Sequence, residues 1–230
     1  MEKLIIHSAP EQETAIKGYY KWHAKVYQLT RWTFLFGRRR IIHALEIPMF
    51  SELTVLEVGC GTGYNLNILS RFYPNLQLIG LDLSPDMLNI ASKKLSRFSR
   101  RVLLLENAYG TEPVKLPKRP DVMLFSYCLT MINPGWKEVI LKAYADLPVG
   151  GRIAVVDFHG SPFAWFRKWM KFNHVRMEEH LLPSLKENFE LQRLDILKAY
   201  GGLWTFFIYI GKKKAPEFAD KSTSQYSTEE

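Results

Sequence analysis

The stretch Val55-Leu56-Glu57-Val58-Gly59-Cys60-Gly61-Thr62-Gly63-Tyr64-Asn65-Leu66 decides the fold of this chain. A short apolar run meets three glycines at alternate positions and leads into a helix-compatible sequence, which predicts a strand, a tight turn and a helix start. Because glycine has no Cβ, Gly59, Gly61 and Gly63 allow sharp turns and let a ligand lie against the main chain. Similar turns also join strands to helices that bind nothing, so the motif alone leaves both interpretations open.

A second apolar run, Leu76-Gln77-Leu78-Ile79-Gly80-Leu81, ends in Asp82, roughly 20 residues beyond the turn. An acid at this position binds ribose hydroxyls in dinucleotide-type folds. An acid after a strand also suits a helix N-cap, but Ser84, followed by Pro85, already predicts that cap. We therefore expect Asp82 to be free for a ligand.

These two stretches, with Ser84-Pro85-Asp86-Met87-Leu88, resemble the class I methyltransferases that use S-adenosylmethionine. The chain has Tyr64 where the Gly-x-Gly-x-x-Gly loop of nicotinamide enzymes has its last glycine, and a cofactor without phosphates fits that departure. The resemblance implies that Glu57 and the loop hold the methionine part of the cofactor, while Asp82 holds the ribose. The cofactor-binding residues that it implies are Glu57, Gly59, Cys60, Gly61, Gly63, Asp82, Leu83, Met87, Asn107, Ala108 and Ser126.

Strand and helix signals alternate from Thr54 onward, which predicts an α/β fold with a parallel sheet and helices on both faces. The later strands are expected at residues 102–106, 121–125, 152–157, 191–197 and 203–210. The resemblance implies a Rossmann-like, seven-stranded sheet that is mostly parallel, and 203–210 is expected to be its antiparallel last strand.

The chain of 230 residues is 47% hydrophobic and can bury one sizeable core. We expect a methyltransferase domain at 51–211, an aromatic and basic helical cap over the substrate at 1–50, and a disordered tail at 212–230. Two cysteines give neither a disulfide framework nor a zinc spacing, so we expect no metal and a reducing, cytoplasmic compartment.

The net charge of +8 points toward anionic partners, either a phospholipid surface or nucleic acid, although a basic enzyme without such a partner also fits. The fourth predicted strand is followed by Ser126-Tyr127-Cys128-Leu129 and lacks the Asp/Asn-Pro-Pro-Tyr signature of nucleic-acid amino methyltransferases. We therefore expect no nucleic acid, and a peripheral position on the inner face of an anionic membrane. A basic nucleic-acid-binding or RNA-modifying protein stays as the alternative of a different class. The sequence does not predict the oligomeric state.

The insert at 160–190 contains Phe163-Ala164-Trp165-Phe166-Arg167-Lys168-Trp169-Met170-Lys171-Phe172, with Ser161 as its expected cap. At about 100° per residue, the large apolar side chains fall on one half of the helix and the three cations on the other. Such a helix suits the interface of an anionic membrane. It equally suits a helix that buries its apolar half on its own sheet.

Residues 18–160 also resemble the bacterial N-methyltransferases that complete betaine lipids from a diacylglyceryl-homoserine precursor. The matching stretches are Tyr20-Lys21-Trp22-His23-Ala24-Lys25-Val26-Tyr27, Arg31-Trp32-Thr33-Phe34-Leu35-Phe36-Gly37-Arg38, Phe125-Ser126-Tyr127-Cys128-Leu129-Thr130-Met131-Ile132 and Val155-Val156-Asp157-Phe158. Phosphatidylethanolamine N-methyltransferases and quinone C-methyltransferases share the cofactor half. The acceptor that this resemblance implies is an amine-bearing lipid; other small molecules, methylated on carbon or oxygen, stay as alternatives.

The type of acceptor decides which residues catalyse methyl transfer. An amine needs mainly alignment and desolvation, and Tyr20, Tyr27 and Tyr127 are expected to line its site because aromatic faces favour the developing cation. Arg31 or Arg38 is the expected partner of the carboxylate or phosphate of the headgroup. A quinol or phenol would need a base instead, for which His159 or His23 is available. His159 also fits a capping or packing role.

Overall fold

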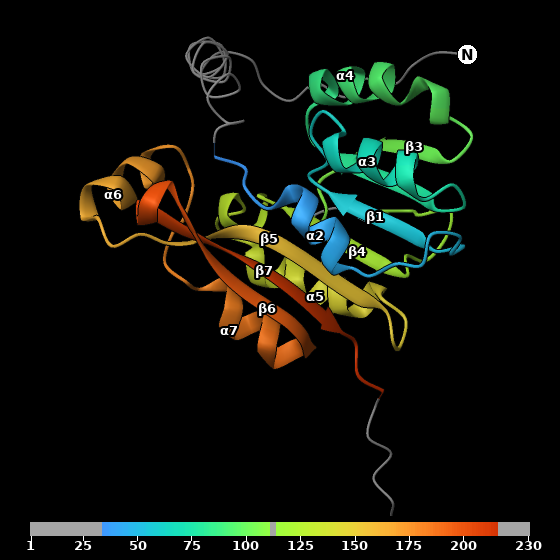
Figure 1. Cartoon of the computed structure of the whole chain (residues 1–230). Helices are drawn as coiled ribbons and strands as arrows, with labels where there is room; N and C mark the ends of the chain where they lie inside the picture. Colours follow the sequence, from blue (N-terminus) through green and yellow to red (C-terminus); the bar gives the residue numbers. More distant parts are fainter. Residues whose placement is uncertain (1–33, 111–113, 216–230) are drawn as a thin grey trace, which may run out of the picture. The chain divides into compact units, whose positions relative to one another are not determined.

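The structure, a computed structural model, describes residues 34–110 and 114–215 (Figure 1). The chain divides into two compact units, Met1–Phe36 and Gly37–Glu230, and the second contains the elements described below. No helix among the described residues has the length and the apolar character needed to cross a membrane.

Within the described residues, seven strands form one sheet in the order β3-β2-β1-β4-β5-β7-β6. Strands β1 to β5 pair in parallel, whereas β7 is antiparallel to both β5 and β6. This topology confirms the predicted Rossmann-like sheet, including its antiparallel last strand. The strands are β1 (Thr54–Val58), β2 (Gln77–Asp82), β3 (Val102–Glu106), β4 (Val122–Ser126), β5 (Arg152–Gly160), β6 (Glu190–Ala199) and β7 (Trp204–Lys212).

Helices cover both faces of this sheet, as the alternating pattern predicts (Figure 1). One face carries α2 (Arg38–Ala44), α3 (Tyr64–Phe72) and α4 (Pro85–Leu95), and the other carries α5 (Trp136–Asp146) and α7 (Leu181–Asn188). Strands β1 and β4 are buried along their whole length, as expected for parallel strands covered on both sides. The remaining elements are α6 (Ala164–Phe172) and the short turns η1 (Ser96–Phe98), η2 (Leu129–Met131) and η3 (Tyr200–Gly202).

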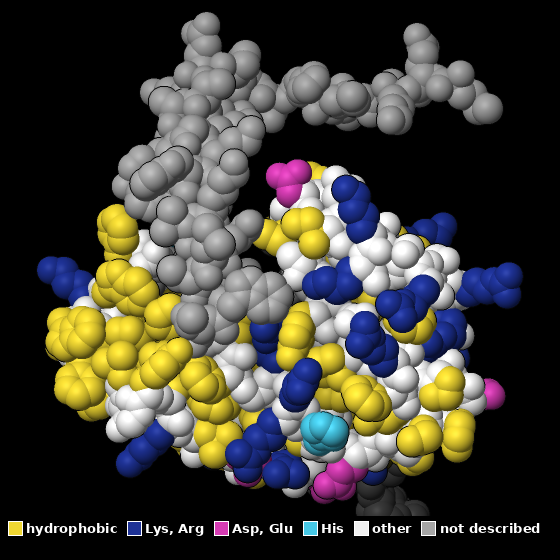
Figure 2. Space-filling view, turned by 45° about the horizontal axis from the view of Figure 1, so that its top comes forward, with side chains coloured by type: hydrophobic (Ala, Val, Ile, Leu, Met, Phe, Trp, Pro, Cys, Tyr) yellow, Lys and Arg dark blue, Asp and Glu magenta, His cyan; other side chains and the backbone are white. Residues whose placement is uncertain are grey.

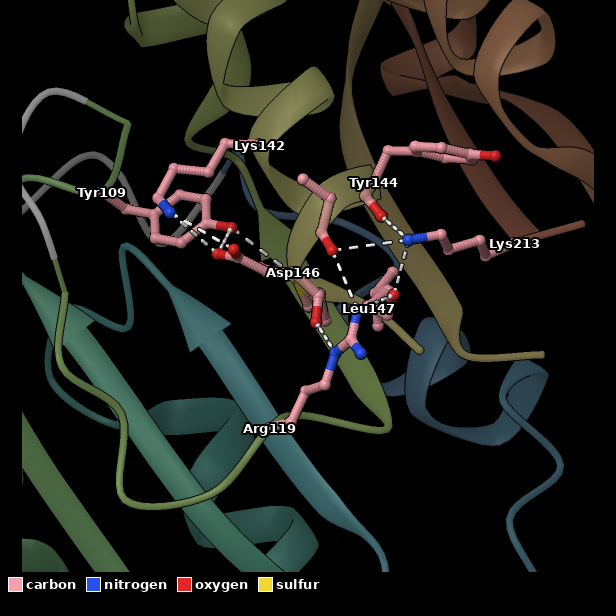
Figure 3. Close-up of polar contacts among 9 residues, drawn as sticks. Tyr109, Arg119, Lys142, Tyr144, Asp146, Leu147 and Lys213 are labelled. Carbon is pink, nitrogen blue, oxygen red and sulfur yellow. Dashed lines mark hydrogen bonds and ion pairs between the residues drawn. The ribbon is translucent and has the colours of Figure 1, made fainter. Parts of the chain in front are cut away.

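The C-terminal end of α5 is tied to two segments that are distant in the sequence (Figure 3). Arg119 donates from Nε to the carbonyl of Asp146 at 2.6 Å and from Nη2 to that of Leu147 at 2.8 Å. Lys213 donates to the Leu147 carbonyl at 2.7 Å. Cations at this end satisfy carbonyls that the helix itself leaves without partners. Lys212, which ends β7, and Lys213 are thus ordered, although the sequence assigned both to the tail.

Two helix starts test the predicted caps. Ser84 caps α4 as predicted, since its Oγ accepts the Met87 amide at 3.4 Å. Ser161 does not cap α6, whose N-cap is Phe163. The Ser161 hydroxyl instead donates to the Leu203 carbonyl at 2.7 Å and accepts the Phe163 amide at 3.1 Å. Because this hydroxyl joins the loop to the turn before β7, the helix begins later than the sequence predicts.

Candidate active site

The glycine loop between β1 and α3 has a left-handed backbone at its three glycines, with φ of 68° at Gly59, 53° at Gly61 and 69° at Gly63. Their surroundings differ. A Cβ at Gly59 would lie 2.9 Å from Cys128 Cβ and one at Gly63 2.9 Å from a methyl of Leu95, whereas one at Gly61 would meet nothing within 4 Å. Gly59 and Gly63 therefore permit close packing of the protein on itself. Gly61 is the position where a ligand can approach the main chain.

Asp82, at the end of β2, is bound to this loop. Its Oδ2 accepts the Gly61 amide at 2.7 Å, and its Oδ1 accepts the Ser84 amide at 2.9 Å. The expectation that Asp82 is free is therefore wrong, because both oxygens already accept backbone hydrogen bonds. Each carboxylate oxygen has a further lone pair, so the carboxylate can still accept bonds from hydroxyl groups while the loop holds it in place.

Glu57, in β1, is buried beneath the loop. Its Oε1 accepts a hydrogen bond from Asn65 Nδ2 at 2.7 Å, whereas its Oε2 has no hydrogen-bond partner among the described residues. Burial raises the pKa of Glu57 to about 8, although the Asn65 bond and the positive charge of Arg38 lower it. A buried carboxylate oxygen without a donor suits a cationic ligand group such as an ammonium.

Arg38 supplies positive charge on the same side. Its guanidinium carbon lies 3.9 Å from the ring centroid of Tyr64, the first residue of α3. Its charge also lowers the pKa of Lys94, although burial is the larger cause. Lys94 Nζ donates to the Thr62 carbonyl at 2.8 Å and so ties α4 to the loop. The structure thus places Arg38 beside the glycine loop.

The other residues predicted for the cofactor follow along the same edge of the sheet. The Asn107 amide donates to the Asp82 carbonyl at 3.2 Å, and the Cys60 amide donates to the Leu81 carbonyl at 2.8 Å. Leu83 is exposed, while Met87 and Ala108 are partly buried. Burial raises the pKa of the Cys60 thiol, which therefore stays protonated. The residues predicted for the cofactor, including the buried Ser126 at the end of β4, thus lie on the loop, at these strand ends or on the first turn of α4.

The segment after β4 is held by Asp157 of β5. Asp157 is fully buried and accepts three hydrogen bonds. The donors are the Thr130 hydroxyl at 2.5 Å, the Thr130 amide at 3.2 Å and the Phe158 amide at 2.8 Å. Burial raises its pKa to about 6 against these bonds, which lower it. Tyr127 lies in the same segment with φ of 56°, and its ring packs edge-on against Phe158 at 4.7 Å between centroids. Asp157 therefore fixes the position of the segment that carries Tyr127.

His159 follows Phe158 in β5, where the pairing with β7 is irregular between Phe158 and Gly160. Its Nε2 lies 3.7 Å from Glu179 Oε2, and its ring packs edge-on against Phe207. Burial lowers the pKa of His159, although the nearby Glu179 carboxylate raises it. This setting favours the packing role over that of a base. Tyr20, His23, Tyr27 and Arg31 lie outside the described residues.

Comparison with known proteins bears on this arrangement. A family model for the methyltransferase domain matches residues 56–153, from β1 to the start of β5. Malonyl-[acyl-carrier protein] O-methyltransferase of Priestia megaterium is 26% identical over 149 residues, which are 64% of this chain and 53% of that protein. Demethylmenaquinone methyltransferase of Tropheryma whipplei is 28% identical over 212 residues, 84% of each chain. These findings support the assignment of the chain to the class I S-adenosylmethionine-dependent methyltransferases. The chain spans about half the length of the first of these relatives.

A solved structure agrees with this fold. The N-methyltransferase NodS from Bradyrhizobium japonicum, in complex with S-adenosyl-L-homocysteine, matches with a TM-score of 0.62 and 16% identity over 77% of this chain and 87% of that one. The cofactor of the class is S-adenosylmethionine, and the residues present fit it. Glu57 Oε2 has no hydrogen-bond donor among the described residues, and the space beside Gly61 is open. Asp82 has lone pairs that can accept hydrogen bonds from hydroxyl groups.

Two residues of the site escaped the sequence analysis. Asn65 lies eight residues after Glu57, and Lys94 lies 32 residues after Thr62. Neither is part of the glycine motif, and an Asn or a Lys on a helix usually faces solvent. The signal that could have found Asn65 is its position on the first turn of the helix directly after the loop.

Proposed function

We propose that this protein transfers a methyl group from S-adenosylmethionine to the amine of a lipid headgroup. The observation that carries the cofactor half is the open face at Gly61, whose amide is bonded to Asp82. We assign Asp82 to the ribose hydroxyls and Glu57 to the methionine ammonium. Arg38 suits the methionine carboxylate because of its place beside the loop, and this replaces the role in substrate binding that its sequence suggested.

The cofactor supplies an electrophilic sulfonium methyl, so the protein has to align and desolvate the acceptor. Tyr127 and Phe158 are only 1% and 3% exposed, and we assign their packed rings to the wall of the acceptor site. Asp157 holds the segment that carries Tyr127. Aromatic faces favour a developing ammonium without binding the lone pair of the amine. In this role Tyr127 would act with Tyr20 and Tyr27, and Arg31 would bind the anionic part of the headgroup.

The described residues favour an amine over an acceptor that needs a base. His159, the described candidate for a base, packs between Glu179 and Phe207. The lone pair of a neutral amine attacks the sulfonium methyl while the bond from that methyl to sulfur breaks, so no base is needed for the attack itself. The methylated ammonium would release a proton to water before each further transfer. The resemblance to betaine-lipid N-methyltransferases makes diacylglyceryl-homoserine the first choice, and phosphatidylethanolamine is an alternative amine. A location on the inner face of an anionic membrane would bring the enzyme to either lipid.

A second candidate is a quinone acceptor. The relative from Tropheryma whipplei, matched over 84% of this chain, is named a demethylmenaquinone methyltransferase. Methylation at a ring carbon would require a base, for which His23 or His159 would be needed.

Expression of the protein in a host with and without the homoserine-lipid precursor tests the proposal. Mass spectrometry of the lipids should show trimethylated betaine lipid only when the precursor and the wild-type protein are both present. The Asp82→Ala variant serves as the control for cofactor dependence and should give little product. If methylated phosphatidylethanolamine appears instead, phosphatidylethanolamine is the acceptor in place of the homoserine lipid. An unchanged lipid profile together with a methylated quinone would overturn the proposal that the acceptor is an amine.

A further inference from the structure

Helix α6 is anchored by one narrow face. Phe166 and Met170 are each 3% exposed, and the Phe166 ring stacks on Trp204 of β7 with 5.4 Å between centroids and 14° between planes. At about 100° per residue, these two side chains occupy one sector of the helix. The sequence left open whether α6 buries its apolar half or presents it, and this sector accounts for only part of that half.

The rest of the apolar half is exposed. Trp165 is 64% exposed and Phe172 is 70% exposed, and both lie in a sector next to the buried one. Phe163, Trp169 and, from η3, Tyr200 add further exposed aromatic surface. Figure 2 shows a broad cluster of hydrophobic side chains on the side of the molecule where α6 lies. A contiguous apolar patch on a soluble surface marks an interaction site. We call these five residues the aromatic ridge.

Cations border the aromatic ridge. Arg167, Lys168 and Lys171 are exposed and occupy the sector of α6 on the other side of the ridge from Phe166 and Met170. The helix therefore presents, in order around its axis, a buried face, an aromatic face and a basic face. Long basic side chains keep their charged ends in the aqueous headgroup layer while neighbouring aromatic rings lie deeper, which is the arrangement of an interfacial helix.

A pocket of about 460 Å³ lies at the C-terminal end of α6. It is lined in part by Lys171, His174, Arg176 and Glu178. Arg176 Nε donates to Glu178 Oε2 at 2.7 Å, which occupies one of the five guanidinium donors. The bond from Arg176, followed by the charges of Arg176 and Lys171, holds the pKa of Glu178 below its usual value. Two cations and one carboxylate among its lining residues give the pocket a positive balance, which suits a phosphate group.

We propose that the aromatic ridge and this basic pocket together form a docking surface for an anionic phospholipid bilayer, with the ridge inserted among the lipids and the pocket on a lipid phosphate. This inference rests on the proposed function. The docking surface would hold the enzyme at the membrane in which its lipid acceptor lies. Charge complementarity selects a bilayer as the occupant, because basic and aromatic faces adjoin on one helix and end at a pocket for an anion.

Sedimentation with vesicles tests the aromatic ridge. The wild type should pellet with vesicles of phosphatidylcholine and phosphatidylglycerol, and binding should fall as salt is added. Trp165→Ser combined with Phe172→Ser should lower the partition coefficient roughly tenfold or more. The matched control is Phe50→Ser, because Phe50 is also 70% exposed but precedes β1, distant in sequence from α6. Equal pelleting of the double variant and the control would overturn the ridge as a bilayer site.

A second experiment tests the pocket. Lys171→Gln combined with Arg176→Gln should weaken binding to phosphatidylglycerol vesicles roughly tenfold or more, since each cation near an anionic surface adds to the binding. Lys118→Gln, at an exposed lysine before β4, is the control and should bind as the wild type does. Inorganic phosphate equal in concentration to the lipid should not displace the protein. Displacement by inorganic phosphate would assign the pocket to a free anion and overturn the lipid site.

Two further measurements separate this inference from the proposed function. Calorimetry with S-adenosylhomocysteine should give the same affinity for the ridge and pocket variants as for the wild type, which also shows that the variants are folded. Light scattering should show the same particle mass for all of them. A smaller particle for the ridge variant would make the patch a contact between copies of the chain and overturn the inference. Vesicle binding without any lipid methylation would overturn the proposed acceptor only.

Discussion

The Gly61 amide donates a 2.7 Å hydrogen bond to Asp82 Oδ2 and thereby joins the loop after β1 to the end of β2. The same carboxylate accepts the Ser84 amide, so it also fixes the start of α4. One acidic side chain thus orders the loop that we propose as the cofactor site before any cofactor binds. This arrangement reduces the ordering that binding would otherwise require.

Replacement of Asp82 by Ala should lower the affinity for S-adenosylhomocysteine. The change would remove the proposed charge-assisted bonds to the ribose, which are worth about 1.5 to 3 kcal/mol, or about tenfold to a hundredfold in affinity. Titration calorimetry measures the change. Asp86→Ala is the matched control, since Asp86 is an exposed acid on the first turn of α4. Equal losses in both variants would remove the specific role of Asp82.

Substitutions at two glycines should separate packing from ligand access. Gly63→Ala places a Cβ 2.9 Å from a methyl of Leu95 and 3.1 Å from Ala91 Cβ, so it should lower the melting temperature. Gly61→Ala meets no neighbour, and its left-handed backbone costs only about 1 to 2 kcal/mol, but its methyl would occupy the space that we assign to the ligand. It should therefore lower affinity more than stability. If Gly61→Ala binds S-adenosylhomocysteine as tightly as the wild type does, the ligand does not lie against Gly61.

Glu57 should make both stability and cofactor binding depend on pH. Its pKa is raised from 4.5 to about 8 in the folded chain, so the folded state binds more protons than the unfolded state between these values. The free energy of unfolding should therefore fall as pH rises through this range, and Glu57→Gln should flatten the profile. A cationic ligand favours the carboxylate form, so affinity should rise between about pH 6 and pH 8. A wild-type affinity that does not change with pH would contradict this assignment.

Asp157→Ala should be strongly destabilising. It leaves the Thr130 hydroxyl and the amides of Thr130 and Phe158 without an acceptor in a fully buried place. Each unsatisfied group costs about 1 to 3 kcal/mol, and a chain of this size loses about 2 to 4 °C in melting temperature per kcal/mol. Thermal unfolding followed by circular dichroism gives the value. Thr130→Val removes only one of these partners and should lower the melting temperature less. An equal decrease in both variants would mean that Asp157 stabilises the fold through other groups.

The sequence predicts the sheet well because each strand is signalled by its own residues. The apolar runs predicted the seven strands, and Ser84 predicted the start of α4. Contacts between distant segments have no such local signal. Asp82 looked free because the Gly61 amide, 21 residues away, is absent from its local pattern. Ser161 looked like a cap because its bond to Leu203, 42 residues away, could not be foreseen.

The lack of a local signal for distant contacts also explains why the sequence did not predict the position of Arg38 or the buried part of α6. The position of Arg38 over Tyr64 depends on the packing of α2 against α3, which the sequence of neither helix encodes alone. The periodicity of residues 163–172 showed an apolar half. Only the stacking of Phe166 on Trp204 showed which part of that half is buried and which part is exposed.

The most direct test of methyl transfer to a lipid amine uses purified protein, vesicles that contain diacylglyceryl-homoserine and S-adenosylmethionine with a deuterated methyl group. Mass spectrometry of the lipid should show successive addition of labelled methyl groups until the quaternary betaine is formed, and the Asp82→Ala variant should give little label. Absence of label in this lipid and in phosphatidylethanolamine, in a preparation that binds S-adenosylhomocysteine, would contradict the account.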